Sequence, residues 1–280
     1  KTNLATFFNL FIEKPKEEYV NEALNKLIAL GAVNKNTGKV TNLGYGMSKL
    51  NTEPEYARML IAAYNYGVLE KICNLCAMLE IGKMSNFLTE MKSKDKKNKE
   101  KLQHFMNARN EFKSDSDHIS MINIYERYMK EDNKSDFCRE YYLNKNNFSK
   151  IQSLSKEFKY QVERIAKREK NLSDSEYLYR KDIDFKNSSE DIKILAALTE
   201  GLFINLFKRN NNSYQTCFPV KKESGNIQRI SFVSSDVKYG IYTSFESIFG
   251  RSLFTMVSKL PNEIINYLKN RKQKYLQKCL

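Results

Sequence analysis

Residues 117–144 read DHISMINIYERYMKEDNKSDFCREYYLN and carry more information about the fold than any other stretch of the chain. Apolar residues recur here at steps of three and four, which predicts one buried face of a helix. Serine and aspartate side chains at positions 114–117 offer oxygens that cap a first helical turn. We therefore predict a capped, amphipathic helix whose apolar face consists of Ile119, Ile122, Tyr125 and Met129.

The same stretch contains polar residues that a plain core helix does not need. We expect Asp117 to cap the helix and His118 to make a fixed hydrogen bond in the interior of its domain. We expect Asn123 to be a buried, hydrogen-bonded amide. The alternatives are a catalytic histidine and an asparagine that reads a nucleobase, and we rank both below the structural roles.

The composition is that of a basic, globular chain. Its 280 residues suffice for two or three compact units, at ~100–200 residues per domain. There are 47 Lys and Arg against 33 Asp and Glu, and this net charge of +14 favours a polyanionic partner such as nucleic acid or an acidic membrane surface. High Lys, Asn and Tyr without Trp resembles the output of an AT-rich genome, which weakens the argument from charge.

Membrane and secretion signals are absent from the sequence. No apolar run approaches the ~18 residues of a spanning helix, and no signal peptide opens the chain. We therefore expect a soluble, intracellular protein without a membrane partner, and leave the nucleus, the cytoplasm and a virion open as locations. The chain begins at Lys1 rather than Met, which suggests a portion of something longer.

Catalytic and metal-binding motifs are also missing. No G-x-x-x-x-G-K-[ST] phosphate loop occurs, because the segment 82–85 lacks both the earlier Gly and a Ser or Thr directly after Lys83. With only two histidines in the chain, His104 and His118, we expect neither a catalytic triad nor a histidine-based zinc site. The C-x-x-C pair Cys73 and Cys76 lies in an apolar helical run, so core packing is the better interpretation. We expect no catalytic residue, metal site or cofactor in this chain.

The N-terminal quarter follows the pattern helix, tight turn, short hairpin, helix. Gly31 follows an apolar stripe over residues 20–28 and predicts a left-handed helix end. Residues 33–40 are expected to pair around a hairpin turn, before Thr41 caps the next helix. A helix followed by such a wing is typical of winged-helix domains.

The middle of the chain is predicted to be helical. Residues 53–90 show two apolar helical faces, and helices resume to about residue 170 after a lysine-rich run at 92–101 that we expect to be a solvated loop. An irregular segment at 171–189 precedes a long apolar helix that we extend to Leu206.

The last seventy residues change to strand patterns. Short β-rich runs occupy residues 214–220, 227–233, 239–245 and 253–257, and Pro261 opens a terminal helix. Several short strands with a flanking helix fit a small barrel of the oligonucleotide-binding (OB) type.

Taken in order, these segments resemble the C-terminal region of DEAH-box RNA helicases over nearly the whole chain. Two departures are Phe137, where the family tends to have Trp, and residues 145–147, where it tends to have Arg-Ser. The matching motifs lie at residues 23–33, 40–50, 54–60, 70–79, 117–125, 137–144 and 197–216.

This resemblance implies a mainly α fold with a small β-barrel. We divide it into an N-terminally truncated winged helix at 1–52, a helical ratchet (helicase-associated) domain at 53–209, and an OB-fold with terminal helix at 210–280. In the parent protein it implies two upstream RecA-like lobes that bind ATP and Mg²⁺, translocation from 3′ to 5′ along RNA, and a possible glycine-rich, G-patch-type regulator. The alternatives are a free-standing nucleic-acid-binding module and a protein-interaction adaptor, both without a motor.

Candidate site residues follow from these assignments. Amide and ammonium donors suit phosphates and base edges, and an aromatic ring offers a stacking platform. Surface solubility is the alternative role of the lysines, and packing that of the tyrosine. As structural residues we predict Asp117, His118, Asn123, Gly31 and Gly44; as contacts to single-stranded RNA we predict Asn144, Lys145, Asn146, Asn147, Lys150, Lys208, Arg209 and Tyr214.

Overall fold

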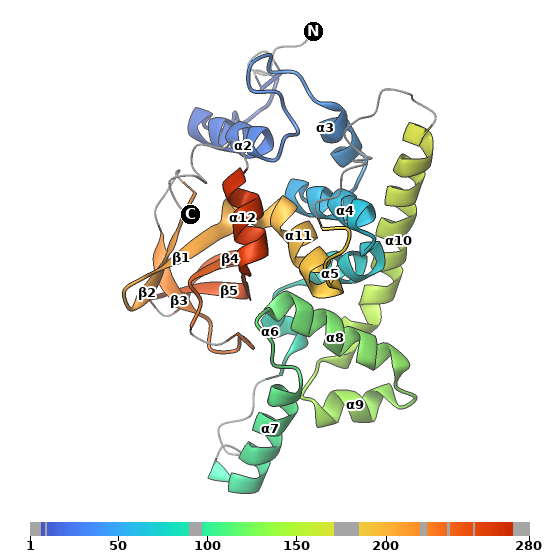
Figure 1. Cartoon of the computed structure of the whole chain (residues 1–280), viewed down its shortest axis with the longest axis vertical. Helices are drawn as coiled ribbons and strands as arrows, with labels where there is room; N and C mark the ends of the chain where they lie inside the picture. The colour runs from blue at the N-terminus through green and yellow to red at the C-terminus, as the bar shows by residue number, and fades with distance from the viewer. Residues whose placement is uncertain are drawn as a thin grey trace.

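The computed structural model of the chain is mainly helical, with a five-stranded sheet in its C-terminal part (Figure 1). It describes residues 7–8, 10–89, 97–170, 185–218, 223–233, 236–248 and 250–270. Half of the lysine-rich run, the segment 171–184 and positions 219–220 of one predicted strand therefore lie outside the described residues. In Figure 1 the N-terminal helices form one end of the molecule, and the long helix α10 (Lys145–Lys170) lies on the opposite side from the sheet.

The N-terminal unit, by which we mean residues 7–50, has the predicted order of helix, tight turn, short paired segment and helix. Helix α2 (Glu17–Ala29) is followed by Gly31 with a φ of 78°, a conformation that glycine adopts without strain. Val33 and Val40 then form an isolated antiparallel bridge. The left-handed glycine turn and the pairing within residues 33–40 are both confirmed.

Helix α3 (Asn42–Met47) begins where the sequence predicts its cap. The Thr41 hydroxyl accepts a hydrogen bond from the Gly44 amide at 3.0 Å, and it donates to the Gly31 carbonyl at 2.7 Å. A side chain at Gly44 would overlap the backbone of Ala32, so glycine allows the helix to approach the preceding turn.

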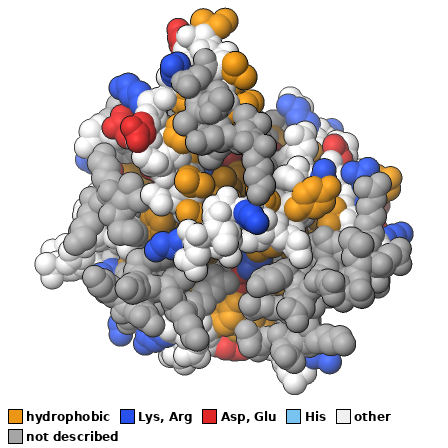
Figure 2. Space-filling view, turned by 90° about the horizontal axis from the view of Figure 1, so that it is seen from above, with side chains coloured by type: hydrophobic (Ala, Val, Ile, Leu, Met, Phe, Trp, Pro, Cys, Tyr) orange, Lys and Arg blue, Asp and Glu red, His pale blue; other side chains and the backbone are white. Residues whose placement is uncertain are grey.

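Figure 2 looks onto this end of the molecule and shows apolar side chains at the surface among basic ones. Helix α2 contains no buried residue, although its apolar stripe is half-buried. The exposed large apolar side chains of the N-terminal unit are Phe7, Leu10, Phe11, Ile12, Tyr19, Val40 and Tyr45.

Four helices make the main helical core. Helix α4 (Pro54–Tyr66) packs against α11 (Glu190–Leu202), and α5 (Leu69–Ile81) packs against α10. Both cysteines of the C-x-x-C pair are buried in α5, which confirms core packing. Four further helices belong to this part of the described chain: α6 (Met84–Phe87), α7 (Lys99–Glu111), α8 (Asp117–Lys130) and α9 (Lys134–Glu140).

The five strands form one sheet in the order β1-β2-β3-β5-β4, which closes because β1 also pairs with β4. All neighbours are antiparallel except β3 and β5. Phe207 and Phe254 stack inside it with ring centroids 5.1 Å apart. The strands are β1 (Leu206–Asn210), β2 (Ser213–Thr216), β3 (Ser224–Ile227), β4 (Tyr239–Ile248) and β5 (Arg251–Lys259), followed by helix α12 (Asn262–Asn270).

Two predicted elements are misplaced. The helix extended to Leu206 ends at Leu202, and a short 3₁₀ turn leads into β1, because Phe207 is needed inside the closed sheet. The strand predicted at 227–233 lies instead at Ser224–Ile227. Downstream of it, backbone and side-chain donors at 231–232 bind a helix residue instead of a neighbouring strand.

A close approach of α11 to α4 gives the first testable prediction. A side chain at Gly201 would overlap the backbone oxygen of Glu55, which cannot move without displacing α4. We expect Gly201→Ala to lower the free energy of unfolding by about 3 kcal/mol, measured by urea denaturation. Gly67→Ala is the comparison: its φ of 74° is unfavourable for alanine but nothing lies within 4 Å, so it should cost about 1 kcal/mol. If Gly67→Ala loses as much unfolding free energy as Gly201→Ala, or more, the close packing of α11 against α4 is contradicted.

Candidate nucleic-acid interface

The first turn of α8 meets the sheet through a cluster of serines. Ser116 caps the helix, because its hydroxyl accepts from the Ile119 amide at 3.1 Å. The same hydroxyl lies 2.6 Å from that of Ser258 in β5, and the two residues form an isolated antiparallel bridge. The prediction that Asp117 is the cap is therefore wrong by one position: Ser116 caps the helix, and Asp117 is its first residue.

Asp117 is fully buried and binds β5 and the segment between β3 and β4 rather than its own helix. Its carboxylate accepts from the backbone N–H groups of Phe232 at 2.7 Å and Val257 at 2.8 Å. The Ser231 hydroxyl also lies 2.8 and 2.9 Å from its two oxygens. Burial raises the pKa of Asp117 above its usual value, while these donors act in the opposite direction.

His118 lies beside this carboxylate and is also fully buried. Its Nδ1 is 2.6 Å from the Ser258 hydroxyl, and its Nε2 is 2.9 Å from the Thr243 hydroxyl of β4. Burial lowers the pKa of His118 to about 3, so the ring is neutral at physiological pH. Both ring nitrogens have a protein partner, which favours the structural role over catalysis.

Asn123 and Met129 are not where the sequence predicts them. Both are exposed, while Ile122, Tyr125 and Tyr128 face the core. The buried face of α8 is thus rotated toward Tyr128, because this tyrosine packs with Phe148 of α10 at a centroid distance of 5.3 Å. The predicted buried amide at Asn123 is wrong.

The segment before α10 is held by backbone hydrogen bonds to the end of α6. The Thr89 amide donates to the Tyr142 carbonyl at 2.7 Å, and the Asn144 amide donates to the Phe87 carbonyl at 2.8 Å. Tyr142 has a φ of 56°, an unfavourable conformation for a non-glycine residue. This short antiparallel pairing fixes where α10 begins.

Most of the predicted RNA contacts in this region lie at the surface. Asn144, Lys145, Asn146 and Lys150 are exposed, and Lys145 Nζ donates to the Ser135 hydroxyl at 2.5 Å. Asn147 is half-buried, and its amide donates to the Asn86 carbonyl at 2.8 Å, which gives it a structural role. The exposed donors surround the N-terminus of a 26-residue helix, where the backbone also favours anions.

The predicted contacts in the sheet are less uniform. Arg209 is exposed and pairs with Asp236 at 2.9 Å, and Lys208 is half-buried on the same strand. Tyr214 is only 6% exposed, and its ring lies edge-on to Phe207 inside the sheet at 5.3 Å. The stacking platform predicted at Tyr214 is therefore wrong, and packing is its role. In Figure 1, β1 lies far from the start of α10, so the structure does not bring the two groups together.

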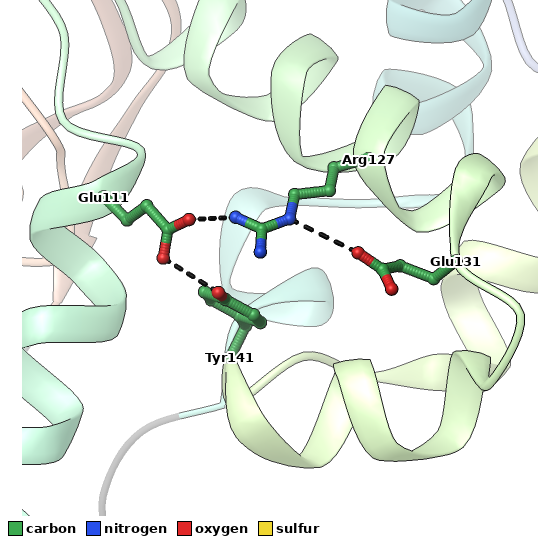
Figure 3. A network of polar contacts seen from close by, with 4 residues as sticks. All are labelled: Glu111, Arg127, Glu131 and Tyr141. Atoms are coloured by element: carbon green, nitrogen blue, oxygen red, sulfur yellow. Dashed lines mark hydrogen bonds and ion pairs between the residues drawn. The ribbon is translucent and has the colours of Figure 1, made fainter.

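Sequence reasoning missed a network around Arg127 that joins α7, α8 and α9 (Figure 3). The guanidinium pairs with Glu111 and with Glu131 at 3.4 Å, and its centre lies 4.8 Å from the ring centroid of Tyr141. The Tyr141 hydroxyl donates to Glu111 at 2.8 Å. Burial alone would raise the pKa of Glu111, but the hydrogen bonds from Tyr141 and Arg127 outweigh it and lower this pKa below its usual value. Only the i,i+4 spacing of Arg127 and Glu131 signals this network in the sequence.

A pocket of about 210 Å³ opens where α5 and α6 face β4 and β5. Lys83 at its edge pairs with Glu246 at 2.9 Å, and its lining includes Tyr56, Met84, Thr243, Ser244 and Met256. Among the described residues, no group of three or more His, Cys, Asp or Glu side chains is placed to hold a metal ion. No helix in the described part of the chain combines the length and the apolar character that a membrane span needs.

The lowered pKa of His118 predicts a pH dependence of stability. A histidine with a folded pKa near 3 and an unfolded pKa near 6.5 contributes stability above pH 6.5 that is lost as the pH falls toward 3. We expect His118→Gln to remove about 1.4 kcal/mol per pH unit from the slope of unfolding free energy between pH 6 and 4. The raised pKa of Asp117 changes the pH dependence of stability in the opposite direction. For this reason the slope of His118→Gln is compared with that of the unmodified chain, in which Asp117 is the same.

His104 provides the control, because it is the second of the two histidines and is exposed. His104→Gln should leave the slope of the unfolding free energy against pH close to that of the unmodified chain. If His118→Gln and the unmodified chain show the same slope of unfolding free energy against pH, the conclusion that His118 is buried and neutral in the folded state is contradicted.

Comparison with known proteins agrees with the resemblance found in the sequence. Residues 53–121, which include α4, α5 and the start of α8, match the family described as "Helicase associated domain (HA2), ratchet-like". The probable ATP-dependent RNA helicase DHX35 of Homo sapiens is 28% identical over 135 residues, which are 48% of this chain and 18% of that protein.

The protein of the same name in Pongo abelii is 28% identical over 134 residues, which are 48% of this chain and 17% of the relative. The chain therefore spans less than a fifth of the length of these two relatives. Together with the family match, these similarities relate the chain to the C-terminal, helicase-associated region of DEAH-box RNA helicases.

Proposed function

We propose that the chain is the C-terminal accessory region of a DEAH-type ATP-dependent RNA helicase that moves from 3′ to 5′ along RNA. The observation that carries this proposal is the order of the parts: a helix with a β-wing, a helical unit that matches a ratchet-like family, and a closed five-stranded sheet. In this proposal the first part is a winged helix and the last is an OB-fold.

The contact with single-stranded RNA is assigned to the first turns of α10. Asn144, Lys145, Asn146 and Lys150 present exposed donors at a helix N-terminus, a combination that suits phosphates and base edges. The overall charge of +14 draws a polyanion toward this surface. Lys208 and Arg209 form a second, separate contact on β1.

The exposed apolar side chains around α2 support the presence of a further partner. An apolar surface of this kind suits association with another domain, and we assign it to the RecA-like lobes of the parent protein. These lobes bind ATP and Mg²⁺, and their movement pulls RNA past the ratchet-like unit and the sheet. The residues of this chain offer no phosphate loop for that nucleotide. A G-patch-type protein is a proposed regulator.

Charge removal at the start of α10 tests the RNA contact. We expect Lys145→Gln with Lys150→Gln to weaken binding of a fluorescein-labelled single-stranded oligouridine about fivefold in fluorescence anisotropy. The dependence of log K on log salt should become shallower by about 1.4, because each lost contact to single strands removes about 0.7.

The matched control lies on the same helix. Lys156→Gln with Lys167→Gln removes the same charge from exposed positions farther along α10 and should have little effect. Equal effects of the two double variants, or binding that ignores ionic strength, would contradict the assigned contact. An upstream sequence without a phosphate loop would favour an adaptor without a motor.

A further inference from the structure

Helix α7 extends from the body of the molecule and is anchored mainly at its C-terminal end (Figure 1). Ala108 is its one buried residue. At the anchored end, Glu111 pairs with Arg127 as Figure 3 shows, and Arg109 donates to the Thr89 carbonyl at 3.3 Å. The preceding turns of the helix therefore present most of their side chains to solvent, on an arm with a fixed base.

The charges on this arm are strongly biased. Between positions 97 and 113 there are five basic residues and two acidic ones, and the acidic Glu111 is paired with Arg127. Lys97, Lys99 and Lys101 are all exposed near its outer end. A helix with this distribution attracts a polyanion, and Glu100 is the acidic side chain among these lysines.

A second feature of the arm is a group of rings at the middle of α7. The Tyr142 ring is half-exposed and lies edge-on to Phe105 at 4.8 Å and to His104 at 5.9 Å. The Tyr142 hydroxyl is 3.4 Å from His104 Nδ1. Tyr142 is also two residues before Asn144, so this group of rings lies next to the exposed start of α10.

We propose that α7 is an additional binding surface for single-stranded RNA. The phosphates lie along Lys97, Lys99 and Lys101, and a base stacks at His104 and Tyr142 on its way to α10. This inference rests on the proposed function and extends its RNA contact. Aromatic rings beside spaced cations favour RNA over an acidic protein, because a base has a flat face to stack and a carboxylate does not.

Charge on the arm is tested in the full 280-residue chain with labelled oligouridine. We expect the triple variant Lys97→Gln, Lys99→Gln and Lys101→Gln to bind about tenfold more weakly and to reduce the salt slope by about 2. The matched control is Lys35→Gln, Lys39→Gln and Lys49→Gln, which removes the same charge from exposed positions of the N-terminal unit. This control should bind nearly as well as the unmodified chain.

Stacking is tested separately from charge. Tyr142→Leu preserves an apolar side chain against Phe105 and removes the aromatic face, and we expect about tenfold weaker binding with an unchanged salt slope. His104→Ala should weaken binding in the same direction, and because His104 is exposed this variant carries little risk of misfolding. Thermal unfolding monitored by circular dichroism verifies that both variants are folded.

The outcomes separate this inference from the proposed function. Weakening in the arm variants but not in the N-terminal control supports the arm. Arm variants that bind like the unmodified chain, while Lys145→Gln with Lys150→Gln bind more weakly, overturn the arm alone. An unmodified chain that does not bind RNA overturns both. Polyglutamate that competes as well as RNA, together with no effect of Tyr142→Leu, assigns the arm to an acidic protein and overturns the inference.

Discussion

The carboxylate of Asp117 is the interaction on which the arrangement of helices and sheet depends. Removing a carboxylate from water is costly unless hydrogen bonds replace its hydration. Here the donors are the amides of Phe232 and Val257 and the Ser231 hydroxyl, all of them in the C-terminal part of the chain. The two buried amides equally require an acceptor, since an unpaired buried backbone donor costs about 1–3 kcal/mol. The acceptor on α8 and the donors in the C-terminal part of the chain therefore satisfy one another. We call this contact the junction.

The rest of the molecule is positioned from this junction. Met256, with a φ of 51°, precedes Val257 in β5, so the strand is bent where its amide reaches the carboxylate. His118 adds two hydrogen bonds to β4 and β5 beside it. From this point α8 extends away from the sheet, and Arg127 near its other end connects it to α7 and to Tyr141. The surface around Asn144 is thus connected to the sheet through packed helices.

Local chemistry made much of the helical fold predictable. The turn at Gly31, the cap at Thr41 and the apolar faces of α4 and α5 depend on residues within a few positions of one another, and the sequence shows these spacings directly. The environment of Asn123 was not predictable in this way, because the rotation of α8 is set by Tyr128 against Phe148, a contact with another helix.

The junction and the sheet were less predictable because they depend on distant partners. Asp117 bonds to residues 114 to 140 positions away, so its spacing to them carries no signal. The strand predicted at 227–233 was displaced by the same bonds. Tyr214 has an aromatic side chain that could stack on a base, yet in the closed sheet this side chain points inward against Phe207. Closure of a sheet decides which side of each strand is buried, and a single strand does not reveal it.

Hydrogen exchange at the amides of Phe232 and Val257 tests the central claim most directly. In the unmodified chain these two amides should be strongly protected, and in Asp117→Ala their exchange should accelerate by at least tenfold while amides in the middle of α5 and α10 remain protected. That pattern would show that the carboxylate holds the sheet against the helices. Unchanged protection at both amides in Asp117→Ala would contradict the account.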